Sequence, residues 1–239
     1  MEIMRTCCYS FTMGNNSEFT GGFSSPPCFA HELELDENGY MGVDRQAALD
    51  VARFRKAKRD EFGKARRSVS EEEAASAATR IAAWLERVID IRPELVIALY
   101  SPMPGEIDLR DWMHRATARQ ARIALPVVRG RDEPLLFREW TPECEMEEGM
   151  WRIPVPAAGA ELTPDIVIMP LIGFDAENYR LGSGGGFYDR TLARLTPRPI
   201  TVGVGYSFTK LSSIFPQPHD IPMDIIITET GDPIHRTTD

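Results

Sequence analysis

Residues 180–190, which read Arg-Leu-Gly-Ser-Gly-Gly-Gly-Phe-Tyr-Asp-Arg, decide the fold of this chain. An apolar run at 166–170, Ile-Val-Ile-Met-Pro, comes before them and predicts a strand buried on both faces of a sheet. A helix is predicted over 187–195, directly after the glycines. Because glycine has no Cβ, successive N–H groups of such a turn can line an anion-sized hollow. A strand, a glycine-rich turn and a helix N-terminus in this order are typical of a phosphate site.

The turn does not match the standard phosphate motifs. No lysine follows the glycines, and the third glycine that G-x-G-x-x-G requires after Gly182 and Gly184 falls on Phe187. The alternative is a tight strand-to-helix turn that binds nothing. Charged residues at both ends of the turn favour a site, because Arg180 suits phosphate oxygens and Asp189 suits a Mg²⁺ ion that also contacts phosphates.

The bulk composition excludes several classes of protein. The 239 residues carry a net charge of -9, which argues against nucleic acid as a partner. No apolar run of about 18 residues is present, so no membrane span is predicted. The N-terminal residues lack the basic and long apolar regions of a signal peptide. The four cysteines form no C-x-x-C pair, which favours reduced thiols and a cytoplasmic location.

Helical and strand patterns alternate along most of the chain. Helices are expected at 44–67, 71–89, 109–120 and 187–195, and strands at 95–100, 122–128, 135–140, 166–170, 200–206 and 225–228. Ser70 and Glu73 form a capping box at the start of the second helix. Strand–helix–strand units of this kind build an α/β domain. We therefore predict a mainly parallel sheet with helices on both faces, a three-layer sandwich.

The domain boundaries follow from the same patterns. The α/β domain is expected to span 44–239, and residues 1–43 are expected to form an irregular N-terminal extension rich in Gly, Ser, Asn and Pro. Apolar residues within 20–40 predict that this part lies on the domain surface or against a partner subunit. Residues 141–160 are expected to be irregular, and the chain after Gly231 is expected to be frayed.

The first predicted helix is strongly basic. Arg55 and Arg59 are four residues apart and therefore share one helix face. One interpretation is a solvated basic face, and the other is a patch that binds a polyphosphate. Eight of the chain's 27 basic residues lie between positions 51 and 70: Arg53, Arg55, Lys56, Lys58, Arg59, Lys64, Arg66 and Arg67.

Four stretches, in this order, resemble the 5-formyltetrahydrofolate cyclo-ligase (5,10-methenyltetrahydrofolate synthetase) family. The first is the basic helix at 55–70, and the second is Tyr-Ser-Pro-Met-Pro-Gly-Glu-Ile at 100–107, at the edge where α/β sheets bind ligands. The third runs from Met-Pro-Leu-Ile-Gly-Phe-Asp at 169–175 to the glycine-rich turn, and the fourth is His-Asp-Ile-Pro-Met-Asp at 219–224. The resemblance covers about residues 50–229 and leaves out residues 1–49.

The resemblance implies an ATP- and Mg²⁺-dependent ring closure of a reduced folate. The formyl oxygen of 5-formyltetrahydrofolate attacks the γ-phosphate of ATP, N10 attacks the activated carbon, and phosphate leaves to give 5,10-methenyltetrahydrofolate. Catalysis of such a phosphoryl transfer is mostly positioning and neutralisation of charge. The sequence indicates no particular oligomeric state.

The resemblance also implies roles for individual residues. Arg180 and Tyr188 would act at the reacting groups, Asp189 and Asp220 would hold Mg²⁺, and the pterin would contact Ser101 and Glu106. Residues 183–187 would face the formyl end of the folate as well as the nucleotide. The family usually has lysine at the position of Arg55, and some members have lysine at that of Gly185. ATP would contact Arg55, Lys56, Lys58, Arg59, Arg180, Gly182, Ser183, Gly184, Gly185, Gly186, Phe187 and Tyr188.

Each acidic residue also has an ordinary structural explanation. Asp189 could cap the following helix, Asp220 could begin a turn, and Glu106 could be solvated. Two other functions stay open at this point. One is an enzyme of the same kind that uses a different acceptor, and the other is a folate- or nucleotide-binding protein without turnover.

Overall fold

The computed structural model describes residues 33–36, 39–42 and 45–237, and the chain divides into two compact units, residues 1–48 and 49–239. In the first unit, β1 (Leu33–Asp36) pairs antiparallel with β2 (Gly39–Gly42). This hairpin corrects the prediction of an irregular segment for these residues. The sequence does hold a turn signal here, the Asn-Gly dipeptide at 38–39. Residues 1–32 lie outside the described part of the chain.

Two helices follow, as the sequence predicts. α1 (Arg45–Arg67) is long and basic, and α2 (Glu71–Val88) begins at a capping box in which Ser70 accepts from the Glu73 N–H. The Glu73 side chain accepts in turn from the Ser70 N–H at 3.1 Å. This reciprocal pair satisfies two N–H groups that the first turn of a helix otherwise leaves without partners.

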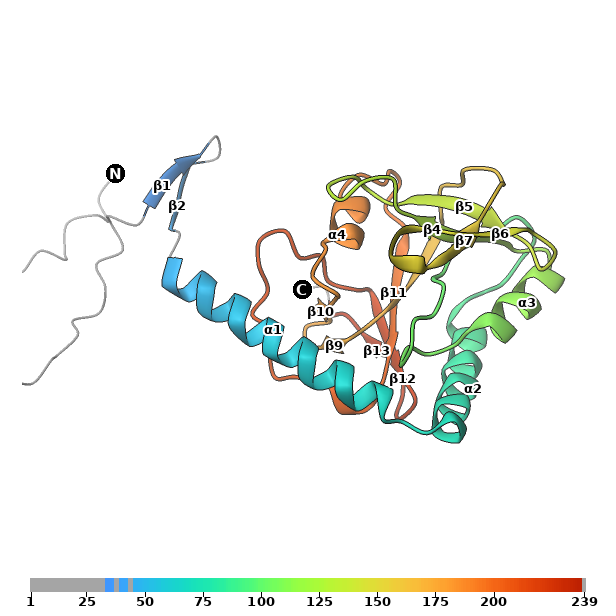
Figure 1. The fold of residues 1–239 in the computed structure, drawn as a ribbon, viewed down its shortest axis with the longest axis horizontal. Helices are drawn as coiled ribbons and strands as arrows, with labels where there is room; N and C mark the ends of the chain where they lie inside the picture. The colour runs from blue at the N-terminus through green and yellow to red at the C-terminus, as the bar shows by residue number, and fades with distance from the viewer. Residues whose placement is uncertain (1–32, 37–38, 43–44, 238–239) are drawn as a thin grey trace, which may run out of the picture. The chain divides into compact units, whose positions relative to one another are not determined.

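The second unit is built on a seven-stranded sheet (Figure 1). Its five central strands are parallel, and each edge strand is antiparallel to its neighbour, so the predicted mainly parallel sheet is confirmed. In spatial order the strands are β13 (Ile234–His235), β12 (Ile225–Thr228), β11 (Ile200–Gly205), β8 (Ile166–Pro170), β3 (Val96–Ala98), β4 (Arg122–Val127) and β5 (Leu136–Trp140).

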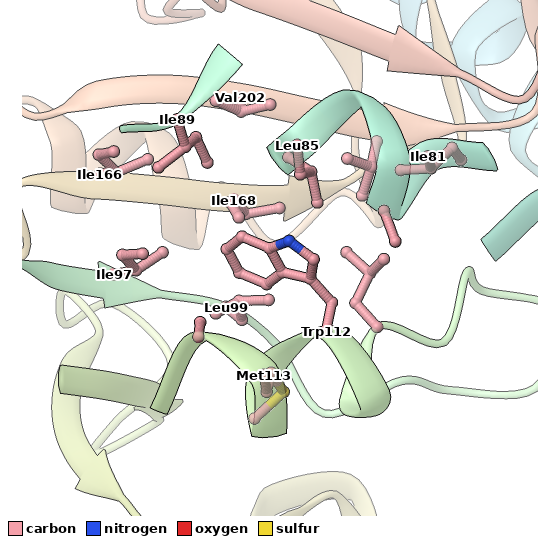
Figure 2. Close-up of a cluster of buried hydrophobic side chains, with 14 of the residues drawn as sticks. Ile81, Leu85, Ile89, Ile97, Leu99, Trp112, Met113, Ile166, Ile168 and Val202 are labelled. Atoms are coloured by element: carbon pink, nitrogen blue, oxygen red, sulfur yellow. The ribbon is translucent and has the colours of Figure 1, made fainter. Parts of the chain in front are cut away.

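Helices cover both faces of this sheet, which confirms the predicted layers. On one face α2 and α3 (Arg110–Ala118) bury an apolar core, and Figure 2 shows Trp112 of α3 reaching toward Leu85 of α2. On the other face, Leu192 of α4 (Phe187–Leu192) packs with Val167 and Met169 of β8. Alternate residues of the central strands face the two cores, which explains why those strands are apolar throughout.

Several short elements differ from the predictions. In the region 141–160, expected to be irregular, β6 (Met146–Glu148) and β7 (Pro154–Pro156) form a hairpin around the 3-10 turn η2 (Met150–Arg152). The end of the chain, expected to be frayed, contributes β13. Before the glycines, β9 (Gly173–Phe174) pairs with β10 (Arg180–Leu181), and a second 3-10 turn, η3 (Ser207–Thr209), follows β11. These elements have two or three residues, too few for a periodic pattern to be recognised.

The sheet topology determines where a ligand can bind. Numbered in chain order, the five parallel strands lie in the spatial order 2-1-3-4-5, so the direction of winding reverses between β3 and β8. Connections leave these two strands toward opposite faces, which opens a crevice beyond their carboxyl ends. The segment 99–106 follows β3 there, and the chain leading to the glycine-rich turn follows β8.

Candidate active site

A cavity of about 570 Å³ lies at this crevice. The ends of β3, β4 and β8 form its floor, and α1, the glycine-rich turn, the 150–155 segment and the 219–220 loop form its walls. It brings together the following residues singled out from the sequence: Arg55, Arg59, Ser101, Glu106, Arg180, Gly182, Ser183, Gly184, Gly185, Gly186, Phe187, Tyr188, Asp189 and Asp220.

Two of the predicted nucleotide contacts lie elsewhere. Lys56 is exposed, and Lys58 donates to Glu61 at 2.7 Å; neither lines the cavity. Helix geometry explains this, because Arg55 and Arg59 lie one turn apart on α1, while Lys56 and Lys58 lie to either side of the line that joins them. Lys56 and Lys58, predicted to contact the nucleotide, thus lie outside the lining of this cavity.

Glycines of the glycine-rich turn lie where a larger residue would crowd a neighbouring arginine side chain. A Cβ on Gly182 would lie 2.7 Å from Nη1 of Arg180, and a Cβ on Gly184 would lie 3.4 Å from Cζ of Arg59. Gly184 also has a φ of +96, in a region that residues with side chains rarely adopt. The missing side chains let two guanidinium groups approach the backbone of the turn, so cations and N–H groups gather on one side of the cavity.

Arg180 and Asp189 form a buried ion pair across the turn. Nη2 of Arg180 donates to Oδ2 of Asp189 at 2.9 Å, and the two side chains are 6% and 14% exposed. The Arg180 guanidinium also lies 5.1 Å from the ring centre of Tyr188. Its buried Nε–H has no hydrogen-bond partner among the described residues, although a buried donor normally finds one.

Arg55 and Asp220 form a second buried pair. Both Nη atoms of Arg55 donate to this carboxylate. Burial alone would raise the pKa of Asp220, but the hydrogen bonds from Arg55 and from the Gln217 N–H hold the pKa below its ordinary value. Burial and the nearby charge of Arg55 lower the pKa of Arg59, whose hydrogen bond within the described part of the chain runs from Nε to the Gly182 carbonyl at 2.7 Å.

Glu106 lines the cavity and is half-buried. Its carboxylate accepts from the Met103 N–H at 3.0 Å. Burial raises the pKa of Glu106, and the hydrogen bond from Met103 and the charge of Arg66 oppose that shift. Ser101 donates its hydroxyl to the Pro154 carbonyl at 2.6 Å, which leaves the oxygen free to accept. This part of the site offers acceptors for N–H groups.

The two carboxylates predicted to hold a metal are neighbours. Oδ1 of Asp189 accepts from the N–H of Ile221, the residue after Asp220, at 3.2 Å. Each carboxylate already pairs with an arginine. Within residues 33–36, 39–42 and 45–237, no group of three or more His, Cys, Asp or Glu side chains is arranged to hold a metal ion. A cation at these two residues would need further oxygen ligands from a bound molecule.

An aromatic wall was missed by the sequence reasoning. Trp151 is 57% exposed, lines the cavity, and meets the ring of Phe187 edge-on at 5.4 Å between centres. Trp151 and the next residue, Arg152, have φ values of 58 and 61, which hold the chain in a sharp turn between β6 and β7. No local pattern marks Trp151 as a site residue, because only the β6–β7 hairpin brings it to the cavity. His219 also lines the cavity.

Comparisons with known proteins identify the family that this chain resembles. The model of the 5-formyltetrahydrofolate cyclo-ligase family matches residues 52–229. The 5-formyltetrahydrofolate cyclo-ligase of Mycolicibacterium smegmatis is 32% identical over 174 residues, 68% of this chain and 87% of that protein. That of Mycoplasma pneumoniae is 31% identical over 134 residues, 56% of this chain and 72% of that protein.

Solved structures give the same result for the fold. The NMR structure of Aquifex aeolicus 5,10-methenyltetrahydrofolate synthetase superposes with a TM-score of 0.67 at 30% identity, covering 77% of this chain and 93% of that one. The 5,10-methenyltetrahydrofolate synthetase of Mycoplasma pneumoniae superposes with a TM-score of 0.61 at 26% identity, covering 74% and 99%. None of the described helices has the length and apolar character needed to cross a membrane.

Proposed function

Because this chain belongs to the 5-formyltetrahydrofolate cyclo-ligase family, we propose that it converts 5-formyltetrahydrofolate to 5,10-methenyltetrahydrofolate with hydrolysis of ATP. The observation that carries the proposal is the convergence of two different ligand sets on one cavity. Arginines and the glycine-rich turn supply groups for phosphates, which we call the phosphate end, and the half-buried carboxylate of Glu106 with the Trp151–Phe187 pair supplies groups for a pterin, which we call the folate end. Such a cavity suits a triphosphate and a pterin side by side.

The phosphate end is built to neutralise charge. Arg59 keeps both Nη groups without a hydrogen-bond partner in the described part of the chain, and the buried Nε–H of Arg180 has none either. Charge-assisted hydrogen bonds from guanidinium to phosphate oxygens are short and strong. We assign the ATP phosphates to these two arginines and to the N–H groups of residues 182–186. Arg180 would hold the transferred phosphoryl group, with Tyr188 packed against its guanidinium.

The folate end is built to orient a flat, hydrogen-bonding ring. Glu106 has acceptor positions beyond the one that the Met103 N–H occupies, and these can receive the N–H groups of a pterin. Ser101 supplies a further acceptor. Trp151 and Phe187 offer aromatic surface beside it. Fixing the formyl oxygen against the phosphoryl group is the positioning that such a reaction needs.

Asp189 and Asp220 fit a Mg²⁺ ion that arrives with the nucleotide. Their oxygens suit the ion, which typically takes one or two carboxylates and completes its shell with phosphates and water. Because each carboxylate has an arginine partner, the pair alone is a poor site for the bare ion. When bound, Mg²⁺ would neutralise charge on the phosphates.

The remaining assignments are also proposals. The family match at 52–229 supports 44–239 as the functional domain, with residues 1–43 as an extension. The net charge of -9 supports a small-molecule substrate over nucleic acid. The lack of a C-x-x-C pair among four cysteines supports reduced thiols and a cytoplasmic location.

The test is a spectroscopic assay of the purified protein. 5-Formyltetrahydrofolate, Mg²⁺ and ATP are mixed with the protein, and the methenyl absorbance is followed against a reaction without ATP. An ATP-dependent rise is expected, together with its loss in Arg59→Ala and its retention in Lys56→Ala. A flat trace with folded protein would overturn the proposal. Stimulation of ATP hydrolysis by a different acceptor would then indicate a changed substrate, and tight folate binding without hydrolysis would indicate a binding protein.

A further inference from the structure

We propose that Arg55 is a positioning residue that fixes the 214–220 loop, and with it Asp220, and that it leaves the phosphates to Arg59. The proposal rests on the proposed function for the identity of the ligand, but the anchoring of the loop does not. Arg55 lines the cavity and is only 8% exposed. From its position alone, Arg55 would be expected to bind a phosphate. Its hydrogen bonds show that it is engaged by the 214–220 loop instead.

The guanidinium of Arg55 is almost fully engaged by the loop. Nε donates to the Ile214 carbonyl at 2.9 Å, and Nη2 donates to the Phe215 carbonyl at 2.9 Å and to Oδ2 of Asp220. Nη1 donates to Oδ1 of Asp220 at 3.4 Å. A guanidinium has five N–H donors, so only one is left for a ligand. A phosphate could bind Arg55 only by displacing contacts that hold the chain.

These contacts stabilise a strained part of the loop. Phe215 has a φ of 54, which is unfavourable for a residue with a side chain, and it is 50% exposed, so burial does little to hold it. Arg55 binds the carbonyls of Ile214 and Phe215, the two peptide units on either side of the Phe215 Cα. Asp175 adds a third anchor by accepting from the Ile214 N–H at 3.0 Å.

The same side chain holds the other end of the loop. Oδ2 of Asp220 accepts from Arg55 and from the Gln217 N–H, the latter at 2.6 Å, while the Asp220 N–H donates to the Gln217 carbonyl at 2.9 Å. One guanidinium thus joins residues 214, 215 and 220. The direction of the Asp220 carboxylate, which the proposed function uses for Mg²⁺, depends on this junction.

Arg59 shows the opposite arrangement on the same helix face. Its Nε donates to the Gly182 carbonyl, which aims the side chain along the glycine-rich turn, and its Nη groups have no partner within the described residues. A lysine at position 55 would keep the positive charge, but it lacks the planar fork with which Arg55 reaches acceptors on three residues at once. The variant Arg55→Lys therefore keeps the positive charge and loses most of the hydrogen bonds that anchor the loop.

The test measures hydrogen exchange of the full-length protein without ATP or folate. In Arg55→Lys and in Asp220→Asn, we expect the amides of Ile214, Phe215, Gln217, His219 and Asp220 to exchange at least about tenfold faster, because two or more charge-assisted hydrogen bonds are lost. The control Arg59→Ala should keep the exchange of this loop unchanged. Asp220→Asn decides the result if Arg55→Lys does not fold, since it breaks the junction from the loop side.

A second measurement separates anchoring from phosphate binding. Titration with Mg²⁺ and ATP should show about a tenfold or greater loss of affinity in Arg59→Ala and a smaller loss in Arg55→Lys. Wild-type exchange in Arg55→Lys, or in Asp220→Asn, would overturn the proposal. A loss of affinity in Arg55→Lys equal to that in Arg59→Ala, with an unchanged loop, would make Arg55 a phosphate ligand. If the protein proved inactive toward 5-formyltetrahydrofolate, the exchange result would still decide the anchoring.

Discussion

The Arg180 guanidinium donates a hydrogen bond of 2.9 Å to the carboxylate of Asp189, so the two residues that bound the glycine-rich turn are joined through their side chains. The pair closes the turn into a ring, and both side chains are buried. A charge that loses its partner in such surroundings is costly, because water cannot replace the partner.

Breaking this pair from one side should destabilise the protein. We expect Asp189→Leu to lower the free energy of unfolding by about 3 kcal/mol, since it leaves the Arg180 charge uncompensated. The double variant Arg180→Met/Asp189→Leu should cost less than the sum of the single variants. Chemical denaturation of the three variants measures this coupling. Strict additivity would mean that the pair does not stabilise the turn.

Arg59 and Lys56 form a matched pair of cations on one helix. Arg59→Ala should raise the KM for ATP by about tenfold to a hundredfold, because hydrogen bonds between charged groups contribute about 1.5–3 kcal/mol. Lys56→Ala should leave the KM unchanged, since Lys56 is exposed and does not line the cavity. Steady-state kinetics of the purified variants measure both. Equal effects would indicate a general basic surface instead of a defined phosphate site.

Binding of Mg²⁺ should require the nucleotide. Calorimetry with Mg²⁺ alone should show no saturable binding, because Asp189 and Asp220 are each paired with an arginine. With ATP present, Mg²⁺ should increase the affinity for the nucleotide, and Asp189→Asn should reduce that increase. Saturable binding of the bare ion would contradict the assignment of these carboxylates to a metal–nucleotide complex.

We expect the Glu106 carboxylate to lower the stability of the folded protein at neutral pH and to contribute to folate binding. Since burial raises the pKa of Glu106 above its unfolded value, its contribution to stability is full below the unfolded pKa and is lost as the pH rises through the folded pKa. Glu106→Gln should therefore unfold at a higher temperature than the wild type at neutral pH, and the difference should shrink toward acid pH. Thermal unfolding across this range measures it.

The same substitution should weaken the binding of folate. Replacing the carboxylate by an amide removes a charged acceptor, and we expect about a tenfold or greater rise in the dissociation constant for 5-formyltetrahydrofolate. A stabilised variant that still binds folate as the wild type does would exclude Glu106 from the pterin site. The stability measurement is independent of that outcome.

Trp151 should report on the folate end of the site. Its exposed ring should be quenched by iodide in the free protein, and 5-formyltetrahydrofolate should protect it. Trp112 and Trp140 are buried already, and the half-buried Trp84 does not line the cavity, so its quenching should not change with folate. Trp151→Ala should raise the KM for the folate by about twofold to tenfold, the value expected for one aromatic contact. Unchanged quenching at saturating folate would mean that the ligand does not reach this wall.

The sequence alone predicted the elements whose signals are long or local. The apolar runs at 95–100 and 166–170 predicted strands buried within a parallel sheet, because a strand buried on both faces has no polar side. Ser70 and Glu73 predicted the start of α2, since a capping box depends only on residues three apart. The glycines at 182–186 predicted a close backbone approach, although not which groups make it.

Other features followed from no local signal. The two-residue strands β9, β10 and β13 carry no period that can be recognised, although their pairing partners lie within ten residues in the chain. Trp151 lies in a segment rich in proline and charge, and only the β6–β7 hairpin brings it to the cavity. Lys56 and Arg59 are both cations of one helix, and only the packing of α1 distinguishes them.

What the sequence determined by itself is thus the α/β class, the order of its elements and the residue types available for a phosphate and a folate, because these depend on periodicity and on short motifs. Only the tertiary structure decided how those residues are used. Arg55 and Asp220 are 165 positions apart, and their pairing depends on the long-range packing of α1 against the 214–220 loop. Arg55 is engaged by the loop and Arg59 keeps its Nη groups for a ligand, and this difference depends on three-dimensional distances that cannot be read from sequence spacing.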